Sequence, residues 1–194
     1  MAITSLKSGI STRSGMAGNT LIYPGSYESL QTVTVGAGGA SSIDFTSIPG
    51  TYTHLQIRFI GKSSNQATAA DNLAFRFNSD TGGNYTRHYL DGSGTSATAG
   101  ANTGVSQVYS TISQSSATYP STFGVGVLDI LDYGNTNKYT TTRALSGVDF
   151  NGTGGAIQFT SGLWLNTAAI TNINIRALSG NLTQYSEFSL YGVN

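Results

Sequence analysis

Residues 78–84, with the sequence NSDTGGN, carry side-chain oxygens at alternating positions beside two glycines. Calcium loops use such a pattern because a hard cation takes several oxygen ligands around a sharp turn. The segment has one carboxylate, Asp80, and lacks the downstream bidentate glutamate of such loops. Asp, Asn and Gly are also the usual residues of tight turns. We therefore expect no structural metal here, and the alternating runs 73–77 and 85–90 on either side predict a hairpin.

The two histidines of the chain, His54 and His88, are the next candidates for chemistry. Either could act as a general base or a ligand, but a hydrolytic triad also needs an oriented carboxylate and an activated hydroxyl. No G-x-S-x-G motif supplies that hydroxyl. Both histidines fall on the polar phase of their strands, which predicts exposed residues on a sheet face.

A pair of carboxylates at the end of one run, Asp129 and Asp132, is the minimal equipment of a glycosidase. Asp129 lies within the most apolar run of the chain, however, where pairing with backbone donors or with an arginine such as Arg143 or Arg176 is the stronger prediction. We therefore expect no catalytic residue, no cofactor and no enzymatic activity.

The charge content is low and balanced: 9% of residues are charged, with nine basic and nine acidic side chains spread along the chain. Nucleic-acid and anionic-membrane partners require clustered positive charge, so neither is expected. The absence of cysteine excludes disulfides and thiolate chemistry. No apolar run is long enough for a membrane helix or a secretory signal, which predicts synthesis in a cytoplasm.

Apolar residues alternate with polar ones in short runs separated by Gly, Asn and Ser. This period-two pattern predicts an all-β protein, an antiparallel β-sandwich of the jelly-roll-like kind, with an extended N-terminal arm. The predicted strands are residues 30–35, 42–45, 52–60, 73–77, 85–90, 105–112, 123–130, 139–145, 156–164, 173–177 and 188–193. The predicted core residues are Leu55, Ile57, Phe59, Phe75, Phe77, Phe123, Val125, Val127, Trp164, Ile173, Ile175, Phe188 and Leu190.

The first 27 residues differ from the β-domain predicted for residues 28–194, because they have few apolar residues and no sustained period. Such a segment becomes ordered only when its own domain or a partner holds it. Its start can add a strand to a neighbour's sheet edge by backbone pairing. The predicted anchoring residues of this docking arm are Ile3, Leu6, Lys7 and Arg13.

Three segments, residues 32–58, 161–171 and 188–193 (FSLYGV), together resemble a group of small structural proteins common in tailed-phage genomes, especially those of aquatic and cyanobacterial hosts. The resemblance covers about residues 28–194 and implies a place on the virion, without implying active-site residues.

From the resemblance and the composition we expect a component of the virion exterior, a capsid decoration or cement protein anchored through its arm. Its partners would be the major capsid protein or another virion protein and further copies of itself, with a trimer favoured. The alternative is a tail-fibre or receptor-binding protein whose exposed loops contact host surface glycans, since aromatic faces with short polar side chains suit that task.

Overall fold

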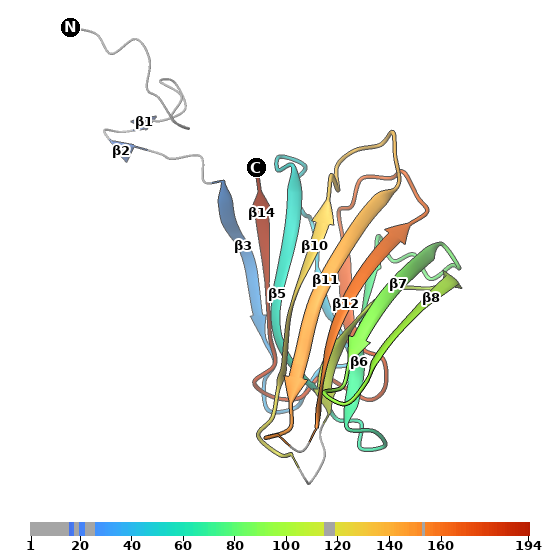
Figure 1. Ribbon diagram of the computed structural model, residues 1–194. Coiled ribbons are helices and arrows are strands. Elements are labelled where there is room, and N and C mark those ends of the chain that lie inside the picture. Colours follow the sequence, from blue (N-terminus) through green and yellow to red (C-terminus); the bar gives the residue numbers. More distant parts are fainter. Residues whose placement is uncertain (1–15, 18–19, 22–25, 115–118, 153) are drawn as a thin grey trace, which may run out of the picture.

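The computed structural model describes residues 16–17, 20–21, 26–114, 119–152 and 154–194. Within these residues it contains fourteen strands and no helix. Twelve strands form the sandwich in Figure 1, and the short strands β1 (Met16–Ala17) and β2 (Thr20–Leu21) pair with each other. The all-β antiparallel sandwich predicted from the sequence is confirmed as two packed sheets.

The large sheet has eight strands that lie side by side across Figure 1. Their spatial order is β3 (Tyr27–Thr34), β14 (Glu187–Val193), β5 (His54–Ser63), β10 (Gly124–Leu131), β11 (Thr140–Asp149), β12 (Gly155–Trp164), β7 (Tyr85–Gly92) and β8 (Ala97–Val105). Every neighbouring pair in this sheet is antiparallel.

The small sheet has four strands, in the order β4 (Ile43–Phe45), β13 (Ile173–Ala177), β6 (Ala70–Phe77) and β9 (Val108–Gln114). It joins the large sheet where the last residues of β5, Lys62 and Ser63, pair in parallel with the end of β9. The two sheets are thus connected along one side.

The core fills the space between the sheets because alternate residues of each strand point into it. On β5 the buried large apolar residues are Leu55, Ile57 and Phe59, in the phase that the sequence predicted. The predicted core residues confirmed in one cluster are Leu55, Ile57, Phe59, Phe75, Phe77, Trp164, Ile173, Ile175, Phe188 and Leu190.

The prediction was wrong for strand β10. Its inward residues are Leu128 and Ile130, both fully buried, while Val125 is 54% exposed and Val127 shares its outward phase. Phe123, just before the strand, is half-buried and also lies outside the core cluster. Both phases of this strand carry apolar residues, so period alone could not identify the inner one.

Glycine explains which phase of β10 faces inward. A Cβ atom on Gly126 would lie 2.3 Å from Cζ of Phe59, so the phenyl ring occupies the space that a side chain would need. The core therefore requires glycine at the inward position of β10 where Phe59 packs, and the valines on either side point outward.

The hairpin predicted around residues 78–84 was also wrong. Strand β6 pairs with β13 and β9, whereas β7 pairs with β12 and β8, so the segment crosses from one sheet to the other. Its first residues, Asn78 and Ser79, have φ angles of 50° and 58°. Residues suited to left-handed turns serve a crossing as well as a hairpin, and the local pattern does not separate the two.

Strand β8 was not foreseen. Its sequence, ATAGANTGV, has no large apolar residue before Val105, and its residues are exposed or half-buried. It is an edge strand held by backbone pairing to β7, which leaves little trace in hydropathy.

We predict that Gly126→Ala destabilises the fold by about 1–3 kcal/mol, because the added methyl group meets the Phe59 ring. Gly134→Ala is the matched control, since a Cβ there meets nothing within 4 Å. Urea unfolding measures both. Combined with Phe59→Leu, Gly126→Ala should cost less than the two single changes summed. Equal midpoints for Gly126→Ala and wild type would contradict the packing described here.

Candidate functional site

The predicted docking residues Ile3, Leu6, Lys7 and Arg13 lie outside the described residues. Their role stays a prediction. The described chain resumes at Ser26, next to β3, which forms one edge of the large sheet.

The two histidines lie on different strands of the large sheet and do not share a site. Three strands separate β5, with His54, from β7, with His88, so roughly 20 Å of sheet lies between them. Nδ1 of His54 accepts a hydrogen bond from the backbone N–H of Asp132 at 2.9 Å. His88 is exposed on the outer face, as predicted, and faces Ser161 across the strands.

The aspartates of the possible glycosidase pair are engaged separately. Asp129 accepts hydrogen bonds from Nε of Arg143 and Nε2 of Gln56, both at 2.7 Å, which confirms the predicted arginine pairing. Asp132 forms an ion pair with Lys138, whose hydrogen bond is the main cause that lowers the pKa of this carboxyl group. Both carboxylates are thus held by neighbouring side chains. The lowered pKa of Asp132 does not suit a general acid, which requires a raised pKa.

The loop of residues 78–84, which has the oxygen pattern of a calcium loop, uses the carboxylate of Asp80 for hydrogen bonds within the protein. Oδ2 of Asp80 accepts from Nε1 of Trp164 at 2.8 Å, and Oδ1 accepts from the N–H of Gly82 at 2.9 Å. Nδ2 of Asn84 donates to both oxygens. Trp164 in turn packs edge-on against Phe77, with ring centroids 5.7 Å apart. Asp80 therefore fastens the crossing loop to the core.

A polar cleft of about 280 Å³ opens between β7 and β6, with side chains that include Asp71, Arg87, Tyr89, Asp91 and Gln158. The guanidinium carbon of Arg87 lies 4.8 Å from the ring centroid of Tyr89, and Tyr109 covers it from a second direction at 4.4 Å. Burial is the main influence on Arg87 and lowers its pKa.

Two atoms of this cleft, Nη1 of Arg87 and Oδ1 of Asp91, are buried without a hydrogen-bond partner among the described residues. Buried polar groups are normally satisfied by protein, water or ligand. We name Asp71, Arg87, Tyr89, Asp91 and Gln158 the polar cleft.

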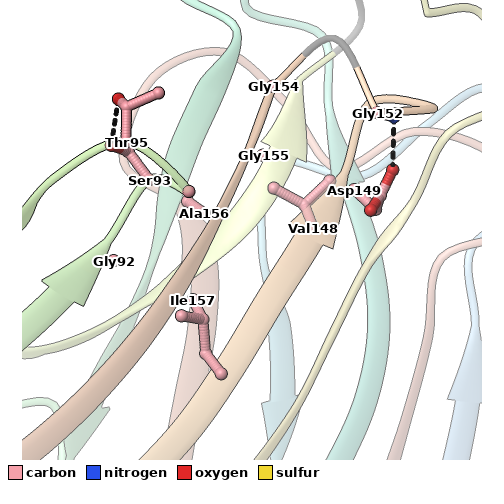
Figure 2. Close-up of a pocket in the computed structure, with 11 residues that line it drawn as sticks. Gly92, Ser93, Thr95, Val148, Asp149, Gly152, Gly154, Gly155, Ala156 and Ile157 are labelled. Atoms are coloured by element: carbon pink, nitrogen blue, oxygen red, sulfur yellow. Dashed lines mark hydrogen bonds between the residues drawn. The ribbon is translucent and has the colours of Figure 1, made fainter.

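A second hollow, of about 480 Å³, lies where the loops after β7 and β11 meet (Figure 2). Glycines and small side chains form most of its wall. Its ionisable side chain, Asp149, accepts a hydrogen bond from the N–H of Gly152 at 3.2 Å. Ser93 and Thr95 contact each other through their hydroxyl groups. The described residues that line this hollow bring together no combination of groups suited to catalysis.

A group of exposed apolar side chains lies on the outer face of the large sheet. Six large apolar side chains there are between 41% and 57% exposed. We call them the apolar face. Its members are Ile60, Leu90, Val125, Leu145, Ile157 and Phe159.

The strand register places these side chains next to one another. Val125 is opposite Ile60, and in the adjacent row Leu145 is opposite Phe159, which is opposite Leu90. The neighbouring row is polar. It contains Gln56, Asp129, Arg143, Ser161 and His88. The apolar face is therefore a patch across five strands with a polar row along one side.

Sequence reasoning did not identify the apolar face. The available signal was a run with apolar residues on both phases, as on β10, where Val125 points outward and Leu128 inward. Such a strand indicates burial on both faces. The polar cleft gave no signal, because its residues come from separate runs.

We predict that protonation of Asp80 loosens the packing around Trp164, the single tryptophan. Burial acts to raise the pKa of Asp80, but the hydrogen bonds from Trp164, Asn84 and Gly82 outweigh it and lower the pKa. The contribution to stability is therefore present above the unfolded pKa of about 3.9 and is lost as the pH falls through the lower folded value.

Tryptophan fluorescence during acid titration measures this loss. Wild type should show a transition below pH about 4 that Asp80→Asn lacks. Asp44→Asn, at an exposed aspartate of β4, is the control and should keep the wild-type profile. An unchanged profile in Asp80→Asn would show that other carboxylates control the acid response.

Among the described residues no helix is long and apolar enough to span a membrane, and no three His, Cys, Asp or Glu side chains cluster as metal ligands. Comparison of the chain with protein-family models and with curated protein sequences finds no match.

Proposed function

We propose that this protein is a structural component of a tailed-phage virion, a decoration protein on the capsid exterior that acts by binding other proteins. The observation that carries the proposal is the apolar face, an outward-facing patch of six large apolar side chains on the large sheet. Monomeric soluble proteins rarely leave so large a contiguous apolar surface uncovered unless it binds something. The resemblance of residues 32–58, 161–171 and 188–193 to phage structural proteins supports the same class.

The geometry of the ionisable groups favours binding over catalysis. The two histidines are three strands apart, and the two aspartates are taken up in separate ion pairs. Low charge also suits a protein that packs against neighbours, because an unpaired charge is costly to bury.

In this proposal the predicted arm, residues 1–27, attaches the protein to the particle through the part that precedes Tyr27, because Tyr27 itself belongs to β3. Ile3 and Leu6 supply apolar anchors, and Lys7 and Arg13 meet carboxylates on the capsid. Exposed ion pairs contribute only about 0–1 kcal/mol each, so most of the attachment comes from backbone pairing, anchor burial and the avidity of several arms.

Deletion of residues 2–25 tests the arm. Tyr27 is retained because it is the first residue of β3, where it pairs with Val193 of β14, and its ring stacks on that of Tyr191 with centroids 4.7 Å apart. The shortened protein should keep its β-type circular dichroism and fail to bind particles that lack the protein. The paired change Ile3→Asp and Leu6→Asp in the full chain should weaken binding in the same direction. If the shortened protein bound particles to the same extent as wild type, the β-domain and not the arm would be the part that docks.

The polar cleft favours a second candidate function, that of a receptor-binding protein for host glycans. Its unpartnered Arg87 and Asp91 atoms could form hydrogen bonds with the vicinal hydroxyl groups of a sugar, and the neighbouring Tyr89 and Gln158 could contact the rest of the sugar ring.

Calorimetry with host surface polysaccharide tests this second candidate function. Binding should be lost in Arg87→Gln and kept in Arg143→Gln, whose guanidinium lies on the opposite face. Equal binding by both variants, or none by wild type, would exclude the cleft.

A further inference from the structure

The apolar face has the size of the core of a protein–protein interface. Its six side chains are about half exposed, and together they form a contiguous patch of roughly 300–600 Å², the size of the largest apolar patch on a typical monomer, which often has a binding function. A stable interface covers about 800 Å² on each partner, rim included. The polar row of Gln56, Asp129, Arg143, Ser161 and His88 supplies such a rim.

The shape of the apolar face is a ridge between two hollows. Leu145 and Ile157 line both hollows and form the ridge. The hollow toward β10 has a volume of about 770 Å³, and glycine at position 147, between Val125 and Ile157, deepens it. The hollow toward β7 has a volume of about 200 Å³.

The chain offers one apolar surface of this extent within the described residues. The other exposed large apolar side chains lie outside the five strands of the apolar face, on β3 or in loops beside strand ends. They are Tyr27, Tyr139, Leu165, Leu178 and Tyr185. A ring such as a trimer joins two different surfaces of each copy, whereas a two-fold dimer joins one surface to itself. A single patch therefore selects the two-fold arrangement.

The charges allow two copies to approach face to face. The formal net charge is zero, so identical chains do not repel one another as wholes. Arg58 is the cation opposite Val127 at the edge of the patch. Its guanidinium lies over the rings of Tyr27 and Tyr191, at 5.1 and 5.5 Å from their centroids, and Nε donates to Gln56. The charge is thus held toward β3 and β14, away from the ridge.

We propose that the protein forms a two-fold dimer in which the apolar face of one copy packs on the same face of a second copy. The Leu145–Ile157 ridge of each copy enters the large hollow of the other. The two outer faces then pack as a second sandwich, at the spacing of about 10 Å that stacked sheets adopt. The dimer takes the place of the trimer favoured from composition. The inference rests on the proposed function, because it names the surface through which copies of a structural protein associate.

Light scattering on the purified full chain tests the dimer without any particle present. Wild type at about 10 µM should have twice the chain mass of 20.2 kDa. Leu145→Glu and Ile157→Glu should each raise the dissociation constant at least about 100-fold, because each places two like charges in a desolvated interface. Thr141→Glu is the matched control on the same face of β11, beyond the polar row, and should remain dimeric.

The variants change exposed positions, so their monomers should fold, and urea unfolding at low protein concentration checks this. Should one charged variant unfold, Leu145→Ser provides the same test without a charge and should weaken the dimer in the same direction. A monomeric wild type would overturn the proposal and assign the face to a different protein. A trimer, or a dimer unaffected by these substitutions, would overturn it as well. Attachment to particles is tested separately by the arm deletion. A full-length protein that forms the dimer but does not bind particles would contradict the proposed function and leave the dimer standing.

Discussion

The contact between Gly126 and Phe59 determines which residues of β10, a central strand of the large sheet, face outward. The ring of Phe59 occupies the place of a side chain at position 126, so β10 can enter the sheet only with its glycine inward. Side chains of a strand alternate between faces, and fixing one position therefore fixes all. Val125 and Val127 are directed outward, next to Leu145 of β11. One packing requirement in the core thus contributes to the apolar face on the exterior.

The crossing between the sheets depends on a different kind of contact, a hydrogen bond between a part-buried aspartate and a buried tryptophan. Asp80 accepts a hydrogen bond from the indole N–H of Trp164. The hydroxyl oxygen of Tyr85 accepts a hydrogen bond from the backbone N–H of Phe77 at 3.0 Å. Trp164, Tyr85 and Phe77 are fully buried and pack as one aromatic group. The loop that resembles a cation site in sequence therefore has a structural use, since it satisfies the polar atoms of this aromatic group.

Period two was enough to predict the sandwich and most strands, because strands such as β5 have one apolar phase, with Leu55 and Ile57, and one polar phase. It failed where that contrast is absent. On β10 both phases are apolar, and on β8 neither is. The partner of a strand depends on contacts far along the chain, so the turn residues from Asn78 onward could not distinguish a hairpin from a crossing.

The candidate surfaces were harder to predict than the fold. The apolar face requires five strands in register, and the polar cleft brings Arg87 and Gln158 together from β7 and β12 with Asp71 of β6. Neither set is local in sequence. The pairing of Asp129 with Arg143 was predictable, because a carboxylate in an apolar strand requires a partner and few cations are present.

The central claim is that the outer face of β10, β11 and β12 is covered in the working form of the protein. Methyl-detected NMR with a soluble paramagnetic agent measures that cover directly. At high protein concentration, the methyl groups of Leu145 and Ile157 should be protected from the agent, while those of Leu165 and Leu178, exposed elsewhere, should broaden. Dilution should remove the protection. Broadening of Leu145 and Ile157 equal to that of Leu165 and Leu178 at every concentration would contradict the account.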